Sequence, residues 1–171
     1  MKKWLGMVSS ALAGILTFVF MALATIYFKA SMTVAGNTTS NTETETAYNL
    51  IKESVSESSP KGFGLYKVMT IVMIVVAVLL MLWAIVMLLQ NLNVLKLKFN
   101  LNLVNAIILA VFAVVAIIAL IALFVMGGDL SGEALGASLK VGPAVGAWLN
   151  TVVAVLACAG GVTAMVMKKS K

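Results

Sequence analysis

The chain offers few of the side chains that carry enzyme chemistry. It contains no histidine, and its single cysteine, Cys158, lies inside an apolar run. A serine or cysteine nucleophile needs a neighbouring base, and zinc sites draw on histidine or clustered cysteine. The acidic residues fall in polar or glycine-rich stretches such as "TETET" (42–46), where carboxylates are normally solvated. Phosphate-binding loops of the GxxxxGK[ST] type are absent. We therefore expect no enzymatic activity, no cofactor and no metal ligand.

Two amide side chains, Asn105 and Asn150, lie inside apolar runs, where an unpaired polar group is costly. Hydrogen bonds between membrane helices contribute about 0.6–2 kcal/mol each. Our favoured interpretation is that both amides bond one helix to another. The alternative is that Asn150 and Thr151 line a hydrated path or touch a substrate.

The elements that must position these residues are predicted to be membrane helices. The chain is 62% hydrophobic and only 11% charged, against roughly 25% charged in a soluble domain, so its solvent must be lipid. Uncharged runs of about 20 residues indicate transmembrane helices, and the sequence has four such runs: 4–28, 66–89, 103–126 and 141–167. The fold class expected is an all-α integral membrane protein, a four-transmembrane-helix bundle in one domain.

The first run follows Met1-Lys2-Lys3 and could be read as a signal peptide. Signal-peptide apolar cores have about 7–15 residues, and this run is longer. We therefore expect it to be a retained helix.

Lysine placement predicts the orientation, since cytoplasmic segments of membrane proteins are enriched in basic residues. The termini and the 90–102 connection carry seven lysines and no acid: Lys2, Lys3, Lys96, Lys98, Lys168, Lys169 and Lys171. The 29–65 and 127–140 connections carry all six acids and, together with Lys67 at the edge of the second run, the other five lysines. Both termini are therefore expected in the cytoplasm, and the protein is expected in the cell membrane.

The long outer connection, 29–65, contains two kinds of sequence. Residues 36–46 are polar without apolar periodicity and predict flexible surface. Residues 47–59 place Tyr48, Ile51 and Val55 on one helical face, after a Thr42-x-x-Glu45 capping box and before Pro60. A short amphipathic helix is expected here, with a solvated loop as the alternative. The glycine-rich 127–140 segment is expected to be a connector, or alternatively a flexible gate.

Small residues allow membrane helices to approach closely, and two runs carry them at spacings of four. The fourth run has Gly142, Gly146, Asn150, Ala154 and Cys158, and the first has Gly6, Ser10 and Gly14. The favoured interpretation is packing within the chain, with a homodimer face as the alternative. The second run is expected to be more exposed to lipid or to a partner.

Between the second and third runs, residues 95–103 alternate apolar and polar side chains as a strand does. Three hypotheses remain open. The flanking helices could extend and meet in a turn, with Leu92, Leu95 and Phe99 on one helical face. The segment could dip into lipid while its lysines meet anionic headgroups. It could also be an edge strand that pairs with a partner. The candidate contact residues for partner or lipid are Leu95, Lys96, Leu97, Lys98, Phe99 and Leu101.

The layout of four spans, a long first outer loop and cytoplasmic termini is similar to that of claudins and tetraspanins. The similarity is one of topology and carries over no residues, because the outer-loop cysteine motifs of those families are absent here. We hypothesise a non-catalytic subunit that scaffolds, stabilises or regulates a larger membrane complex. The alternative is a self-associating pore, channel or holin-like transporter.

The expected partners are membrane lipids and other integral membrane subunits or further copies of the chain. Nucleic acid is not expected, because the lysines flank apolar runs instead of forming a patch and arginine is absent.

Overall fold

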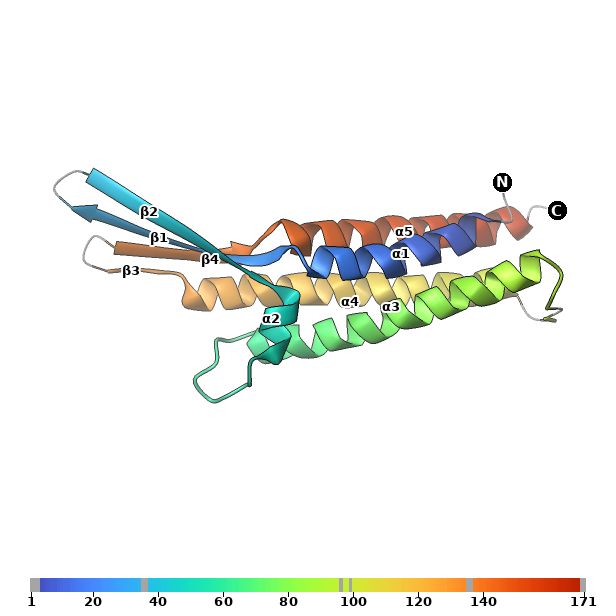
Figure 1. Cartoon of the computed structure of the whole chain (residues 1–171), viewed down its shortest axis with the longest axis horizontal. Helices are drawn as coiled ribbons and strands as arrows, with labels where there is room; N and C mark the ends of the chain where they lie inside the picture. The colour runs from blue at the N-terminus through green and yellow to red at the C-terminus, as the bar shows by residue number, and fades with distance from the viewer. Residues whose placement is uncertain (1–3, 35–36, 96, 99, 135–136, 170–171) are drawn as a thin grey trace.

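A computed structural model describes residues 4–34, 37–95, 97–98, 100–134 and 137–169. Within these residues the chain forms a long helical bundle with a β-sheet that projects from one end (Figure 1). The first residues of α1 and the last of α5 lie at the opposite end, where the α3–α4 connection also lies.

Four helices make the bundle: α1 (Leu5–Met21), α3 (Phe63–Asn91), α4 (Leu101–Leu130) and α5 (Val145–Lys169). Each packs mainly on two neighbours, in the cyclic order α1, α3, α4, α5. Three of them, α3, α4 and α5, are long and apolar enough to cross a membrane. These helices support a membrane protein in general, and the prediction of a mostly helical bundle is confirmed.

The expectation of an all-α fold is wrong, because a four-stranded antiparallel sheet accompanies the bundle. Its strands are β1 (Ala24–Val34), β2 (Asn37–Thr46), β3 (Gly132–Ala134) and β4 (Ala137–Pro143), in the spatial order β2-β1-β4-β3. The 36–46 and 127–140 segments, expected to be a flexible surface and a connector, thus supply most of three strands. Residues 127–130 of the second segment belong to α4, which ends at Leu130.

The single helix expected over 4–28 is also wrong in its last third. Helix α1 ends at Met21 and the chain enters β1 at Ala24. The residues after the break, Thr25-Ile26-Tyr27-Phe28, are β-branched or aromatic and favour strands. Apolar character alone, which located the run, does not distinguish a helix from a buried strand.

The amphipathic helix expected in the outer connection exists but is shorter. Helix α2 covers Ala47–Lys52, and its cap is Thr46, whose hydroxyl accepts the Asn49 N–H at 3.3 Å, instead of the proposed Thr42. Its buried residues are Ala47 and Leu50, whereas Val55 lies beyond the helix and is exposed.

The segment after α2 forms a serine-rich turn. The Ser56 N–H donates to the Ser59 hydroxyl at 2.9 Å. Local bonds of this kind compete with helix formation, so residues 56–59 form a turn and not part of the expected helix.

Candidate functional site

The predicted small-residue stripe of the fourth run does not lie along one helix. Gly142 is in β4, and α5 begins only at Val145. Gly146, Asn150 and Ala154 are on α5, where Asn150 and Ala154 are buried, and Cys158 is half-buried against the core.

Gly146 makes the closest approach of the stripe. A Cβ atom there would lie 2.7 Å from the Phe20 carbonyl oxygen and 2.8 Å from that of Ala24. The absence of a side chain therefore lets α5 contact the end of α1.

The stripe of the first run, Gly6, Ser10 and Gly14, is buried on α1. A Cβ atom at Gly14 would lie 2.9 Å from the Ala77 carbonyl oxygen of α3. Ser10 donates to Asn105 Oδ1 at 2.5 Å, and Asn105 Nδ2 donates to the Gly6 carbonyl at 3.0 Å. Both ends of the Asn105 amide are thus bonded to α1, as an interhelical link between α1 and α4 requires.

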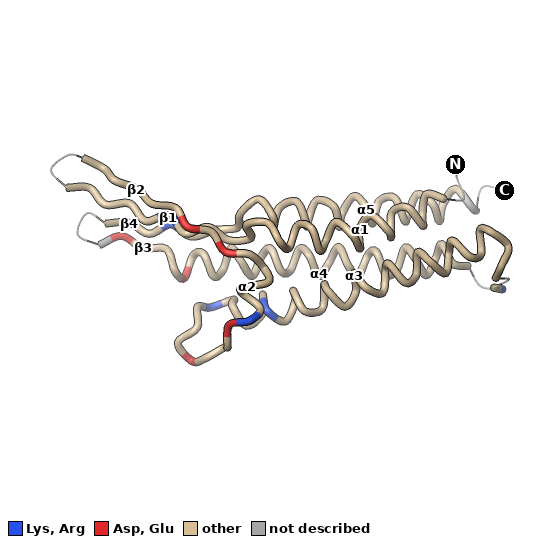
Figure 2. Tube along the Cα trace, viewed as in Figure 1, with Lys and Arg blue, Asp and Glu red and all other residues tan. Residues whose placement is uncertain are grey.

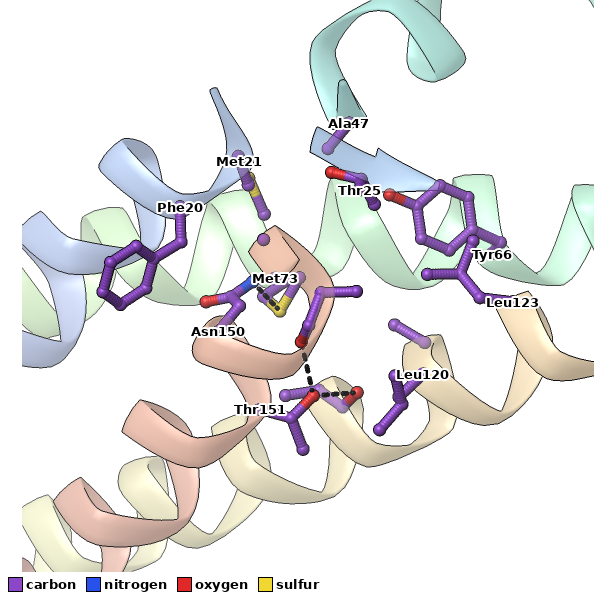
Figure 3. Close-up of a pocket in the computed structure, with 14 residues that line it drawn as sticks. Phe20, Met21, Thr25, Ala47, Tyr66, Met73, Leu120, Leu123, Asn150 and Thr151 are labelled. Carbon is purple, nitrogen blue, oxygen red and sulfur yellow. Dashed lines mark hydrogen bonds between the residues drawn. The ribbon is translucent and has the colours of Figure 1, made fainter. Parts of the chain in front are cut away.

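Asn150 lies in a different setting, beside a small cavity where the sheet meets the bundle (Figure 3). Its Nδ2 donates to the thioether sulfur of Met73 at 3.3 Å, a weak acceptor. Its Oδ1 is buried, and no hydrogen-bond partner for it occurs in the described part of the chain. Thr151 donates its hydroxyl proton to the Ala147 carbonyl at 3.0 Å, with Ala116 O at 3.5 Å on the neighbouring helix.

The cavity beside Asn150 has a volume of about 20 Å³. A single water needs roughly 10–15 Å³ by this measure, so the cavity has room for one water and not for a substrate. Its lining contains hydroxyl, amide and apolar groups from α1, β1, α2, α3, α4 and α5, including Phe20, Met21, Thr25, Tyr66, Met73, Leu120, Leu123, Asn150 and Thr151. None of the lining residues is a carboxylate, lysine or cysteine.

A larger hollow lies on the sheet, beyond the ends of the helices. It has a volume of about 740 Å³ and an open mouth. We call it the sheet groove, and it is lined by Ala30, Ser31, Met32, Thr39, Asn41, Leu130, Gly132, Glu133, Ala137, Ser138 and Leu139. This hollow is of ligand size, and sequence reasoning missed it.

The strand register explains the apolar floor of the sheet groove. Ala30 of β1 pairs with Leu139 of β4, and Met32 pairs with Ala137. Paired residues share a face of the sheet, so these four side chains lie together. The signal was present in the sequence, because residues 26–34 alternate as Ile-Tyr-Phe-Lys-Ala-Ser-Met-Thr-Val. Met32 and Val34 are 57% and 60% exposed, which leaves the outer part of this face uncovered.

The two glutamates of β2 and the lysines of β1 and β4 lie on opposite faces of the sheet. Glu43 pairs with Phe28 and Glu45 with Ile26, so both glutamates project from the groove face. Lys29 and Lys140 pair with each other and project from the opposite face. Figure 2 shows these charges along the sheet, well away from the uncharged middle of the bundle.

The serine-rich loop after α2 is fixed to the end of α4. The Lys61 N–H donates to Asp129 Oδ2 at 3.0 Å, and the Lys61 ammonium lies 3.9 Å from Asp129 Oδ1. This pair is exposed and contributes little stability. It does place the loop on the same side of the molecule as the sheet.

The strand-like ribbon at 95–103 forms no strand in its described part. Leu95, Leu97 and Lys98 are neither helical nor extended in a sheet, while Leu101 begins α4 and is buried. Helix α3 ends at Asn91, so it does not continue through this connection. Lys96 and Phe99 lie outside the described residues. Contact of the ribbon with a partner or lipid stays a prediction.

The described residues contain no cluster of three or more histidine, cysteine, aspartate or glutamate side chains that could hold a metal ion. No protein-family model matches the chain, and no curated protein is similar to it in sequence. Any functional assignment therefore depends on the geometry of the bundle and the sheet.

Proposed function

We propose that the chain is a non-catalytic subunit of a larger complex in the plasma membrane, which it scaffolds, stabilises or regulates. The observation that carries the proposal is a contrast between two parts of the molecule. The cavity beside Asn150 inside the bundle has a volume of only about 20 Å³, whereas the sheet presents an open groove of about 740 Å³ outside the bundle. An open surface groove of this size beside a small interior cavity supports a role in binding another molecule.

The proposed topology is four-pass, with α1 crossing the membrane together with the three longer helices. Helix α1 has 17 residues, or about 25 Å at 1.5 Å per residue, against about 30 Å of hydrocarbon. Its outer face is as apolar and exposed as those of α3, α4 and α5, with Leu12, Ile15 and Val19 at 50–53% exposure. Such a face would be costly in water and is favourable in lipid.

The proposed orientation places both termini in the cytoplasm and the sheet outside. All six acids of the sequence lie in segments at the sheet end of the bundle (Figure 2). The N- and C-terminal segments and the 90–102 connection carry seven lysines and no acid in the sequence, which supports a cytoplasmic position by the positive-inside rule.

The packing of the bundle supports a structural role for its polar residues. Asn105 is fully buried and hydrogen-bonded at both ends of its amide. Thr17 and Thr70 are fully buried too, and the hydroxyl of each donates a hydrogen bond to a carbonyl of its own helix, at 2.7 and 2.8 Å. Polar groups whose hydrogen bonds are satisfied within the bundle do not form a hydrated surface along which ions could pass.

Native mass spectrometry tests the proposal, on protein extracted in mild detergent from its own host. We expect the 18.0 kDa protomer bound to other membrane polypeptides in a fixed ratio. A closed homo-oligomer without other polypeptides, conducting in planar bilayers, would instead favour the self-associating pore. An isolated protomer under conditions that preserve other membrane complexes would contradict both.

A further inference from the structure

The outer edge of β2 has no partner strand in the described part of the chain. The spatial order β2-β1-β4-β3 puts β2 at one edge of the sheet, and eight of its ten residues are exposed. An edge strand presents backbone N–H and C=O groups on which another strand can pair. Proteins commonly block such edges with lysine or proline, and β2 contains neither.

The register identifies which residues direct their backbone groups to the open edge. The hydroxyls of Thr33 and Thr38, which pair across β1 and β2, are 3.0 Å apart. This short side-chain spacing is typical of a non-hydrogen-bonded pair in an antiparallel ladder. The N–H and C=O groups of Thr38 therefore point away from β1, and by alternation those of Ser40 and Thr42 do the same.

The sheet groove lies beside this edge. Thr39 and Asn41 of β2 line it, with Met32 of β1 behind them. In β-strand addition, alternate side chains of the added strand project over one face of the sheet, where they determine specificity. Long apolar side chains at those positions could extend over the short Thr39 and Asn41 side chains to the apolar floor.

Charge favours a basic contact at the bundle end of the same face. Glu43 and Glu45 project from this face, and Glu43 is exposed. No lysine among the described residues lies within ion-pair distance of either glutamate, since Lys29 and Lys140 project from the other face. Opposite charges on directly paired residues stabilise a sheet, whereas like charges destabilise it.

A second copy of the chain fits this edge poorly. The strands run roughly along the bundle (Figure 1), so antiparallel pairing of two β2 strands would turn the second bundle upside down relative to the first. Two copies inserted the same way into one membrane cannot adopt that arrangement. Pairing in the parallel sense would bring the glutamates of the two copies towards each other.

From these observations we propose that β2 and the sheet groove bind an extended segment of a different protein, which adds a strand to β2. The groove-facing side chains of that segment are large and apolar beside Thr39 and Asn41, and lysine or arginine beside Glu43 and Glu45. The inference rests on the proposed subunit function and specifies its binding surface.

A designed peptide provides the probe. Every second residue of the peptide is threonine, and the residues between the threonines are two leucines followed by two lysines. The peptide is made with this sequence and with the reversed sequence, so that parallel and antiparallel pairing with β2 are both tested. Fluorescence anisotropy measures its binding to the full chain in lipid nanodiscs. We expect one direction to bind the wild type, and a peptide with glutamate in place of lysine to bind at least ten-fold more weakly.

Two variants test the site itself. Ser40→Pro removes an outward N–H without removing a bond to β1, and we expect it to weaken peptide binding at least ten-fold, while the matched control Ser40→Ala changes binding less than two-fold. Should Ser40→Pro fail to fold, Glu43→Lys serves instead and should abolish the preference for the basic peptide. Equal binding of the basic and acidic peptides, or undiminished binding by Ser40→Pro and by Glu43→Lys, would overturn the proposal.

Native mass spectrometry of the same variants separates this proposal from the subunit function. Partners that remain bound to Ser40→Pro would overturn the site but leave the subunit function standing. Phospholipid bound to the wild type and lost in Met32→Lys would assign the groove to a lipid, and a dimer lost in Ser40→Pro would assign it to a second copy. Either result would overturn the proposal.

Discussion

At the scale of single residues, the two buried asparagines differ in how their amides are satisfied. Asn105 bonds Ser10 and Gly6 of α1 through both ends of its amide. Asn150 has only the weak Met73 sulfur contact, and its Oδ1 is unpaired within the described residues. Both asparagines lie in apolar runs of the sequence, yet their substitution is expected to change the stability of the protein differently.

Replacing Asn105 by leucine should destabilise the bundle. The change removes both bonds between α1 and α4, and we expect a loss of about 1–3 kcal/mol. Thermal unfolding in detergent measures it, with Thr163→Val as the control, because Thr163 is exposed and its hydroxyl donates to the Ala159 carbonyl of its own helix. A double-mutant cycle with Ser10→Ala should show that the two substitutions are energetically coupled. Unchanged stability of Asn105→Leu would contradict the role of this amide as an interhelical link.

Replacing Asn150 by leucine should leave stability unchanged or raise it. Leucine has the same branched side-chain skeleton and carries no polar atom, so an unpaired buried oxygen is removed without opening a cavity. The same unfolding assay decides the matter by direct comparison with Asn105→Leu. A loss of comparable size would mean that the amide is bonded to a water in the 20 Å³ cavity.

At the scale of elements, the contact between α5 and the end of α1 depends on the absence of a side chain at Gly146. A Cβ atom there would meet backbone oxygens of Phe20 and Ala24 below 3.0 Å, and backbone cannot rotate away as a side chain can. We expect Gly146→Ala to cost about 1–3 kcal/mol as an overpacking substitution. Gly128→Ala on α4 is the matched control, since nothing lies within 4 Å of its added Cβ, and it should be neutral or stabilising. Similar melting temperatures for the two variants would contradict the close approach.

The elements also show how far the sequence could be used for prediction. Helices α3, α4 and α5 follow from apolar length, and their observed bounds exceed or shift the predicted ones by only a few residues. The β1 strand was hidden because Thr25 to Phe28 continue the apolar run of α1, and only the alternation over 26–34 indicates a change of period. The polar β2 strand has no apolar signal of its own and depends on β1 as a template.

The candidate site was less predictable than the fold. Asn150 and Thr151 could be singled out because polar residues in an apolar run are conspicuous. The sheet groove could not, because its floor combines β1 with β4 more than 100 residues later in the sequence. Such pairing depends on tertiary structure, which local patterns do not encode. Conversely, the ribbon at 95–103 shows that alternation without a neighbouring strand does not suffice to form one.

At the scale of the whole molecule, the proposed topology predicts which segments are accessible from outside the cell. In a Cys158→Ala background, single cysteines are introduced at Ser58 in the loop after α2, at Thr38 in β2, at Val94 after α3, and at Lys2. A membrane-impermeant maleimide applied to intact cells should label Ser58→Cys and Thr38→Cys. Val94→Cys, at an exposed position, and Lys2→Cys should react only after permeabilisation.

The Lys2→Cys variant determines whether α1 crosses the membrane. Because β1 follows α1 directly and pairs with β4, which lies between α4 and α5, the end of α1 is held on the same side as the sheet. A helix of 17 residues with an exposed apolar outer face must then extend from that side into the bilayer, and its first residues should emerge on the other. Labelling of Lys2→Cys without labelling of Val94→Cys in intact cells would contradict the crossing of α1, and labelling of Val94→Cys in intact cells would reverse the orientation of the whole bundle. In that second case the groove would face the cytoplasm, and its partner would have to be sought there.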